Sequence, residues 1–364
     1  MISNADFGNN LTELREAKGI TRAELAEALG LSEATVAGWE LGRAFPEIST
    51  LPEIAGALGT DINALFGFVP DSDTPDIDED DDFTYHGDLN SATTGGDLNV
   101  YGNVFGDINS GGSAYVTGQV DGNIEAGGDV TVGGNVAGYI DAGDDVSVAG
   151  RVDGDIDAGG DVTVGGGVCG DIDAGGDIAV RGAVKGDIDA GGDVSIGGAV
   201  NGDIDAGGDL AVNGRVSGDI DVGGDVAING EINGNADIGG DLALNGTADG
   251  NLNVGGDAAV NGQLFDGIDC GGDLSVNGNS KGDLNVGGDL HLLGNLDGDI
   301  SCDGDCRIGS KESGVVYTVT GNIECGGDCE LWCDVDGDVN VDGDLILAGK
   351  VSGALNVGGI IKDK

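Results

Sequence analysis

The sequence predicts an α + β multidomain protein, in which a small all-α domain of five helices precedes a long parallel β-solenoid. An aspartate occurs at every sixteenth position from Asp129 to Asp305, twelve in all, and such a fixed period is typical of repeat folds. Within each repeat, apolar residues alternate with polar residues or glycine, which is the pattern of strands with one buried face. Residues 8–67 lack the repeat and show helical apolar spacing instead.

The helical part, residues 1–67, is predicted to be the five-helix domain. Thr21 and Ser32 precede the second and third helices, where a hydroxyl group can accept a hydrogen bond from a free N–H of the first turn. Pro52 lies in the first turn of a fourth helix, where its missing N–H costs nothing. Residues 61–66 are predicted to form a short fifth helix.

The segment from Thr21 to Glu40, followed by Gly42-Arg43 and Pro46, resembles the Cro- and lambda-repressor-like (XRE-type) helix-turn-helix family, and the resemblance extends over residues 8–67. In that family the third helix enters the major groove of DNA, and its N-terminal residues contact base edges. By position, the resemblance implies DNA contacts from Thr21, Arg22, Ser32, Glu33, Thr35, Gly38 and Arg43, with Arg43 facing phosphate.

Two features of this domain depart from the family. Arg22 and Glu33 stand where glutamine is common, so they could form a salt bridge with each other, or Arg22 could read guanine. Residues 1–67 also carry four basic side chains against ten acidic ones, a net charge of −6. Because DNA affinity depends strongly on phosphate neutralisation, two hypotheses remain open: DNA binding, and a helix-turn-helix that serves as a protein-docking module.

Residues 68–84 are predicted to be a disordered linker, because the acidic run from Asp76 to Asp82 repels itself. Residues 85–361 are predicted to form about 16–17 rungs, a rung being one turn of the solenoid. The interval from Asp305 to Asp328 is 23 residues, so seven residues are inserted there, as a contact loop or a simple excursion.

The repeat from Gly154 to Cys169 illustrates the predicted rung. Numbered from Gly154, its apolar residues occupy odd positions and its aspartates occupy positions 2, 4 and 8. Because sixteen is even, we expect the same positions to face inward in every rung. Gly-Gly and Asn-Gly pairs such as Asn213-Gly214 are expected at corners that need positive φ.

The repeat from Gly122 to Ile220 resembles the bactofilins, a polymer-forming cytoskeletal family, and the resemblance extends over residues 87–358. It implies a compact β-helix, end-to-end assembly without nucleotide, and a scaffolding role. Ile360 and Ile361 lie in the last rung, where no helix or proline covers the strand edge, so we expect them to take part in self-association.

The aspartate rows are expected to repel one another by about 1 kcal/mol per neighbouring pair in water. We expect diffuse cations along them rather than ordered calcium, because calcium-binding solenoids of the RTX type have a nine-residue unit and sixteen is not a multiple of nine. The net charge is −53 for the chain and −14 for residues 1–84, which leaves −39 for the rest. That density, about one charge per 2 Å, approaches that of duplex DNA, so a third hypothesis is that the rod mimics DNA.

The chain has seven cysteines, and five of them fall in the last rungs: Cys302, Cys306, Cys325, Cys329 and Cys333. Converging thiols could hold zinc. There is no Cys-x-x-Cys pair, however, and we expect these residues to be small hydrophobic groups in a dry core, with no metal.

Other classes of protein fit the sequence poorly. No stretch approaches the ~20 apolar residues that a membrane helix needs, no signal peptide is recognisable, and the odd cysteine count suits a reducing compartment. Neither histidine, His86 or His291, belongs to a recognisable nucleophile–base arrangement. The sequence therefore predicts a cytoplasmic, non-enzymatic regulator or scaffold without a cofactor.

Overall fold

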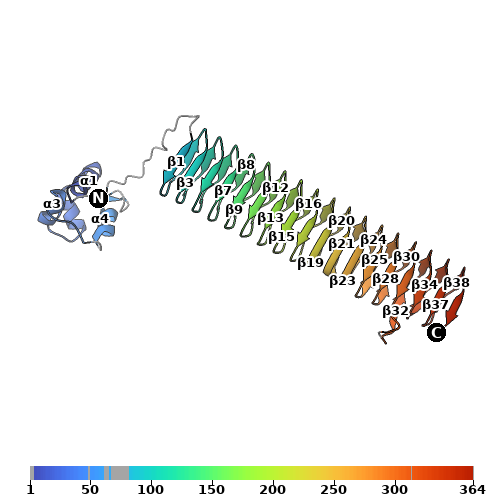
Figure 1. Cartoon of the computed structure of the whole chain (residues 1–364). Coiled ribbons are helices and arrows are strands. Elements are labelled where there is room, and N and C mark those ends of the chain that lie inside the picture. Colours follow the sequence, from blue (N-terminus) through green and yellow to red (C-terminus); the bar gives the residue numbers. More distant parts are fainter. Residues whose placement is uncertain (1–3, 48–49, 61–64, 67–81, 313, 364) are drawn as a thin grey trace. The chain divides into compact units, whose positions relative to one another are not determined.

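The computed structural model describes residues 4–47, 50–60, 65–66, 82–312 and 314–363. Contacts between residues divide the chain into two compact units, Met1–Asp76 and Ile77–Lys364, each of which is described by itself. The first unit contains helices and the second contains strands (Figure 1). This division agrees with the predicted fold class.

The first unit contains four helices within the described residues, rather than the five predicted. They are α1 (Asn4–Ala17), α2 (Arg22–Ala28), α3 (Glu33–Glu40) and α4 (Leu51–Leu58). The predicted fifth helix falls mostly on residues 61–64, which lie outside the described residues. One apolar cluster joins all four helices, and its members include Phe7, Leu11, Leu25, Val36, Trp39, Ile54 and Leu65.

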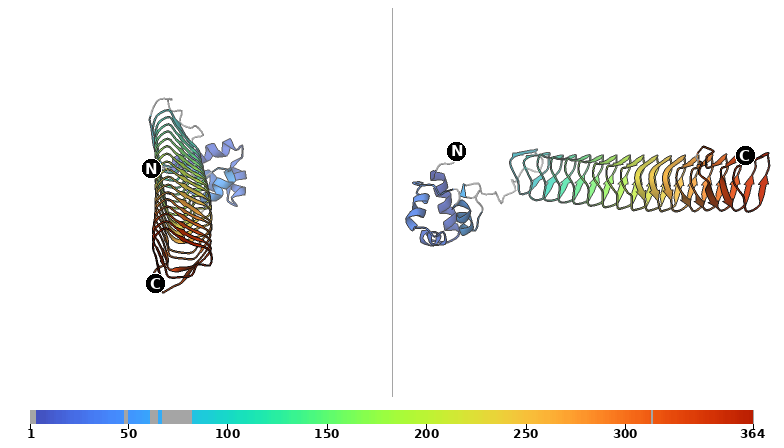
Figure 2. Two further views of the ribbon diagram at one scale, coloured as in Figure 1. Left: turned by 90° about the vertical axis from the view of Figure 1, so that its right-hand side faces the viewer. Right: turned by 90° about the horizontal axis from the view of Figure 1, so that it is seen from below.

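The second unit is a parallel β-solenoid of about 17 rungs, stacked one on another (Figure 2). Each rung has three faces: face 1 at repeat positions 3–5, face 2 at positions 9–11 and face 3 around position 15. The strands of face 1 are β2 (Ala92–Thr94), β4 (Ile108–Ser110), β6 (Ile124–Ala126), β8 (Ile140–Ala142), β10 (Ile156–Ala158), β12 (Ile172–Ala174), β14 (Ile188–Ala190), β16 (Ile204–Ala206), β18 (Ile220–Val222), β20 (Ala236–Ile238), β22 (Leu252–Val254), β24 (Ile268–Cys270), β27 (Leu284–Val286), β30 (Ile300–Cys302), β33 (Ile323–Cys325), β36 (Val339–Val341) and β38 (Leu355–Val357).

Face 2 is the second continuous ladder. Its strands are β1 (Phe83–His86), β3 (Leu98–Tyr101), β5 (Ala114–Val116), β7 (Val130–Val132), β9 (Val146–Val148), β11 (Val162–Val164), β13 (Ile178–Val180), β15 (Val194–Ile196), β17 (Leu210–Val212), β19 (Val226–Ile232), β21 (Leu242–Ala248), β23 (Ala258–Leu264), β25 (Leu274–Val276), β28 (Leu290–Leu292), β31 (Cys306–Ile308), β34 (Cys329–Leu331), β37 (Leu345–Leu347) and β39 (Ile361–Asp363). Its first strand, β1, begins two residues before the predicted start of the solenoid at residue 85.

Face 3 is narrower than the other two. In most early rungs it consists of one bridging residue, as in the series Val152, Val168 and Val184. Strands β19, β21 and β23 then extend onto it, and later rungs use β26 (Ser280–Lys281), β29 (Leu296–Asp297), β32 (Tyr317–Thr320) and β35 (Cys333–Asp336).

Side chains alternate between core and surface as the sequence predicted. Ile156 pairs in register with Ile172 one rung later, and both are buried. Asp157, the middle residue of β10, is exposed. The same buried–exposed–buried pattern occurs in β11 and in nearly every other three-residue strand. The predicted register is therefore confirmed, and identical positions stack in columns.

The corner glycines have a different purpose from the predicted one. In the Gly159–Gly160 pair neither φ is positive, so the expectation of positive φ was wrong for this corner and for most others like it. A Cβ atom at Gly160 would lie only 2.1 Å from Oδ1 of Asp145, and one at Gly159 would lie 2.2 Å from the carbonyl oxygen of Gly143. Glycine is needed there because successive rungs approach too closely for a side chain.

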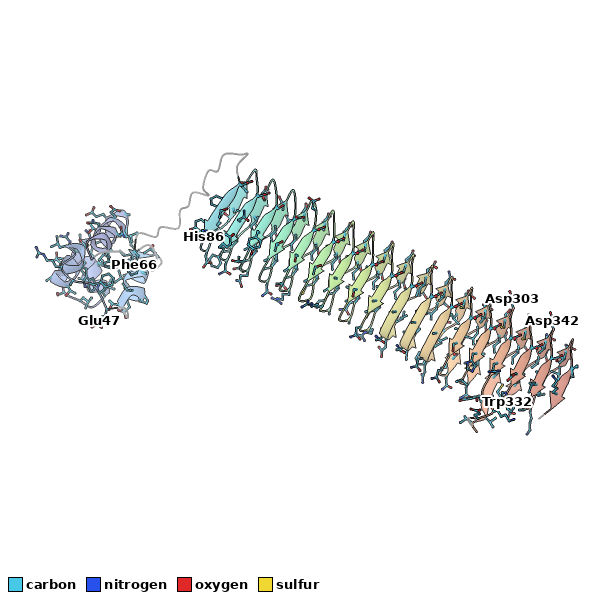
Figure 3. The ribbon with its side chains drawn as sticks, in the orientation of Figure 1. Glu47, Phe66, His86, Asp303, Trp332 and Asp342 are labelled. Atoms are coloured by element: carbon cyan, nitrogen blue, oxygen red, sulfur yellow. The ribbon has the colours of Figure 1, made fainter. Side chains whose placement is uncertain are left out.

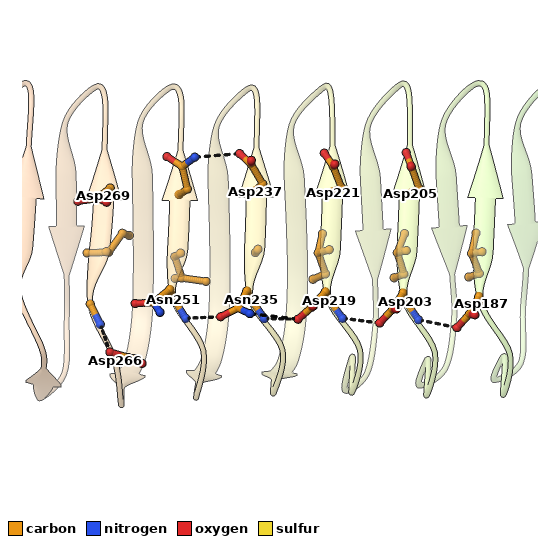
Figure 4. A pocket seen from close by; sticks show the side chains of 18 of the residues that line it. Asp187, Asp203, Asp205, Asp219, Asp221, Asn235, Asp237, Asn251, Asp266 and Asp269 are labelled. Atoms are coloured by element: carbon orange, nitrogen blue, oxygen red, sulfur yellow. Dashed lines mark hydrogen bonds between the residues drawn. The ribbon is translucent and has the colours of Figure 1, made fainter.

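The corner aspartates bond to the backbone of the next rung. Oδ1 of Asp145 accepts the N–H of Asp161 at 2.8 Å, and Oδ1 of Asp171 accepts the N–H of Asp187 at 2.8 Å. These rows run along the stack at positions 8 and 2, and Figure 4 shows the second of them. They satisfy corner N–H groups that the strand ladders leave free. The aspartate rows therefore hold successive rungs together as well as repelling one another.

The seven-residue insertion lies at a corner between face 2 and face 3. The chain leaves the stack at Gly309, whose φ is +78°, and rejoins it in β32. Leu296 pairs with Val319, so the register resumes after 23 residues. Trp332 of the next rung lies next to Gly309 (Figure 3).

Candidate nucleic-acid interface

The α2–turn–α3 segment forms the helix-turn-helix. Thr21 caps α2 reciprocally: its hydroxyl accepts the N–H of Glu24 at 3.2 Å, and Glu24 Oε2 accepts the N–H of Thr21 at 2.7 Å. Ser32 caps α3, since its hydroxyl accepts the N–H of Thr35 at 3.2 Å. Gly30 between the helices has a φ of +67°, which permits the tight turn. The two predicted N-caps are thus present.

The seven residues expected to contact DNA lie on α2, on α3 and just after α3. Thr21, Ser32, Glu33 and Arg43 are exposed, and Arg22, Thr35 and Gly38 are partly exposed. The structure brings two pairs of them together. The hydroxyl groups of Ser32 and Thr35 are 2.8 Å apart, and the carbonyl oxygen of Gly38 accepts the N–H of Arg43 at 2.9 Å.

Arg22 has a different partner from the one considered in the sequence analysis. Its Nε donates to Oε2 of Glu40 at 2.5 Å, and no salt bridge joins Arg22 to Glu33 among the described residues. The other oxygen of Glu40 accepts from Nε of Arg15 at 2.6 Å. Glu40 and Arg15 are both buried. The salt bridge suggested between Arg22 and Glu33 is therefore wrong, and Arg22 belongs instead to a network with Arg15 and Glu40.

Sequence reasoning missed Glu40 and Arg15 as members of this site. Arg15 follows the buried Leu11 by four residues, and Glu40 follows the buried Trp39 and Val36, so both lie on core-facing sides of their helices. An acidic and a basic residue at two such positions could have indicated a buried pair.

The network fixes the charges of its members. Burial works to raise the pKa of the Glu40 carboxyl, but the hydrogen bonds from Arg15 and Arg22 outweigh it and hold that pKa below its usual value. The hydrogen bond to Glu40 raises the pKa of Arg15. Glu40 is therefore ionised at neutral pH and orients both guanidinium groups.

Few basic side chains of the helical unit remain free to contact the phosphate groups of DNA. Arg15 and Arg22 are engaged by Glu40, and the ammonium group of Lys18 donates to the carbonyl oxygen of Ala57 at 2.8 Å. Arg43 is exposed and takes part in no ion pair that involves the described residues. The terminal nitrogens of the half-exposed Arg22 can still reach an anion.

The solenoid offers a second surface, a shallow acidic groove of about 1040 Å³ on face 1 (Figure 4). Aspartates of positions 2 and 4 line it, including Asp203, Asp205 and Asp221. Among the described residues, no group of three or more histidine, cysteine or acidic side chains is arranged to hold a metal ion. Nor does any described helix have the length and apolar character that a membrane span requires.

The five cysteines that were weighed as zinc ligands in the sequence analysis are buried free thiols. Cys302, Cys306, Cys325, Cys329 and Cys333 all lie in the core of the last rungs. They are packed among apolar neighbours, as expected for small hydrophobic residues.

Comparison with known proteins finds similarity in parts of both units. The Helix-turn-helix family HTH_3 matches residues 11–65, and the family described as Flagellar Assembly Protein A beta solenoid domain matches residues 116–245. The immunity repressor protein of Bacillus phage phi105 is 37% identical over 60 residues, which are 16% of this chain and 42% of the repressor. The chain thus covers less than half of that relative's length. No solved structure matches the chain significantly.

These matches confirm the XRE-type helix-turn-helix domain and the β-solenoid. The bactofilin resemblance is not confirmed, because the family that matches the solenoid is that of flagellar assembly protein A. Small inward residues and corner glycines are common to many β-solenoids, so the repeat alone does not separate such families.

Proposed function

We propose that this protein is a cytoplasmic, non-enzymatic DNA-binding regulator or scaffold, in which a helix-turn-helix module is carried by a β-solenoid that associates end to end. The observation that carries the proposal is the capped α2–turn–α3 segment, with Ser32, Glu33, Thr35 and Arg43 on its surface. The similarity to a phage immunity repressor supports a role in binding DNA.

A single copy of this module is expected to bind DNA weakly. Residues 1–67 have a net charge of −6, and most of their cations already have partners. With few phosphate contacts, the affinity is expected to lie near that of non-specific binding, with a Kd of about 10⁻⁴–10⁻⁶ M. Several modules held together would bind far more tightly through effective concentration.

The C-terminal end of the solenoid is suited to join another copy. At inward positions of the last rung, Leu355 and Ile361 are 37% and 47% exposed, whereas Leu345 one rung earlier is fully buried; Ile360, at the corner beside them, is 62% exposed. Among the residues that the structure describes, strands β38 and β39 each pair with one neighbour, which leaves one edge of each strand unpaired. An unpaired edge beside an uncovered apolar core favours continuation of the stack.

Charge supports a head-to-tail arrangement of the copies. Residues 345–364 contain three basic residues and one acidic residue, a net charge of +2, while residues 82–101 contain three acidic residues and no lysine or arginine. The end of one solenoid therefore complements the beginning of the next. A tail-to-tail contact would place like charges together.

DNA binding is tested by fluorescence anisotropy of the full-length protein with labelled genomic fragments. We expect Arg43→Gln to weaken binding about tenfold, and Lys18→Gln to have a smaller effect, because Lys18 already bonds to Ala57. If the full-length protein binds no DNA at physiological salt, the helix-turn-helix is better explained as a protein-docking module.

Assembly is tested by sedimentation velocity. The double variant Ile360→Lys/Ile361→Lys is expected to dissociate the copies. The control Phe265→Lys/Val316→Lys changes two other exposed apolar side chains, 45% and 69% exposed, away from the last rung. A monomeric wild-type protein would contradict end-to-end association.

A further inference from the structure

Two pairs of cysteines lie in register on the rungs that flank the insertion. Cys302 pairs with Cys325 on face 1, and Cys306 pairs with Cys329 on face 2. All four point into the core and are free thiols. In each pair the two residues are adjacent on neighbouring strands although 23 residues separate them in the sequence.

The spacing of these pairs suits a covalent bond. Neighbouring strands of a sheet lie about 4.8 Å apart, and disulfides join residues whose Cα atoms are about 4.4–6.8 Å apart. The thiol of Cys329 has two neighbouring thiols that shift its pKa, that of Cys306 most strongly and that of Cys325 next. Cys270, by contrast, stacks between Val254 and Val286 and has no cysteine on either neighbouring rung.

We propose that Cys306 and Cys329 form a disulfide when the protein meets a peroxide or a small-molecule disulfide, and that this bond locks together the rungs on either side of the insertion. The two S–H bonds break, one S–S bond forms, and the thiols lose two protons and two electrons. A peroxide takes them up to give water and an alcohol, or two molecules of water from hydrogen peroxide; a small-molecule disulfide gives two thiols. Diamide, the oxidant used in the test, is a diazene that takes up the same two electrons and two protons to become a hydrazine.

The bond would strengthen the place where the stack is interrupted. Between β31 and β32 the chain leaves the stack, so this rung lacks a direct connection from face 2 to face 3. A disulfide between Cys306 and Cys329 closes a loop that contains the whole insertion, and such a bond stabilises mainly by restricting the unfolded chain.

The surroundings of the two thiols control the rate at which they are oxidised to a disulfide. The neighbouring thiol of Cys306 is the largest cause that raises the pKa of Cys329; the thiol of Cys325 works to lower it, and burial raises it further. At Cys306 the thiol of Cys329 works to lower the pKa, but burial and the other nearby thiols leave it raised. Because the thiolate is the reactive form, oxidation is expected to be slow at neutral pH and faster as pH rises.

The test treats the folded full-length protein with diamide, then traps remaining thiols with an alkylating reagent and maps disulfides by mass spectrometry. We expect a Cys306–Cys329 peptide pair, and a melting temperature of the oxidised protein several degrees higher that dithiothreitol returns to its starting value. The fraction oxidised in a fixed time should rise about tenfold per pH unit between pH 7 and 8.

Two variants serve as matched controls. Cys306→Val places there the residue that the equivalent Val162 and Val194 provide, so the fold is retained while the diamide-dependent shift is lost. Cys270→Ala introduces the residue found at the equivalent Ala158, and it should keep the shift. Full alkylation of both Cys306 and Cys329 after diamide, or a Cys325–Cys329 bond in their place, would overturn the proposal.

Discussion

The helical domain and the solenoid use acidic side chains in different ways. In the helical domain one buried carboxylate, Glu40, accepts hydrogen bonds from Arg15 and Arg22. In the solenoid many exposed carboxylates each accept one N–H of the next rung, as Asp177 accepts from Asp193. The buried charges of the first unit are therefore concentrated in one ion network, while the carboxylates of the second unit are spread over many equivalent bonds.

A second contrast lies within the solenoid itself. The carboxylates of the corner aspartates bond to backbone N–H groups, whereas the carboxylate of Asp205 on face 1 takes part in no hydrogen bond or ion pair among the described residues. The same residue type thus holds rungs together at one position and only adds negative charge at another. Position in the repeat, rather than residue type, decides the effect.

The largest expected effect concerns the alternation on which the solenoid depends. Val194→Asp would bury an unpaired charge among Ile178 and Leu210, and we expect a loss of about 4 kcal/mol or more in the free energy of unfolding. Ser195→Asp changes the adjacent exposed side chain and should reduce the free energy of unfolding only slightly. Thermal unfolding measures both, and equal losses would refute the inward–outward register.

The next effect concerns the helical domain alone. Glu40→Gln would leave the buried Arg15 without its counter-charge, and we expect a loss of about 3 kcal/mol. The folded pKa of Glu40 is lowered from its ordinary value, so its contribution is fully present above the unfolded pKa and is lost as pH falls through the folded one. Acid titration followed by helical circular dichroism should show this loss in the wild type and not in the variant. An unchanged profile would show that the network does not stabilise the domain.

A smaller effect distinguishes the two kinds of aspartate. Asp193→Ala removes the acceptor for the N–H of Asp209, so we expect the melting temperature to fall by about 2–4 °C. Asp193→Asn should lower the melting temperature less, because an asparagine can accept such a bond: in the row at position 2, Oδ1 of Asn235 accepts the N–H of Asn251. Asp205→Ala should leave the melting temperature unchanged or slightly raised, since only repulsion is removed. Equal falls for Asp193→Ala and Asp205→Ala would contradict the distinction.

The smallest effect concerns a buried hydroxyl group. Ser280 lies between Leu264 and Leu296, and its hydroxyl has no hydrogen-bond partner among the described residues. Ser280→Ala is expected to stabilise the solenoid by about 1 kcal/mol. Ser110→Ala is expected to destabilise the solenoid, because it removes the hydroxyl of Ser110, which donates to the carbonyl oxygen of Gly96 at 2.8 Å. Chemical denaturation should give changes of opposite sign for the two variants.

The sequence predicted the features that follow from local spacing. Because the period is even, the positions of Ile156 and Val162 were predicted to face inward in every rung. Hydroxyl residues that precede apolar helical segments predicted the caps at Thr21 and Ser32. Contacts between rungs or helices were not predictable in this way. The clash that excludes a Cβ atom at Gly160 involves the previous rung, and Glu40 meets Arg22 across 18 residues of sequence.

The central claim is that a weak helix-turn-helix module depends on association of the solenoids for its DNA affinity. The most direct measurement compares, at physiological salt, the Kd for one labelled DNA duplex of the full-length protein, of residues 1–67 alone, and of Ile360→Lys/Ile361→Lys. The account predicts that the full-length protein binds about 10²-fold or more tightly than the other two, which should resemble each other. Equal affinities for all three proteins would contradict it.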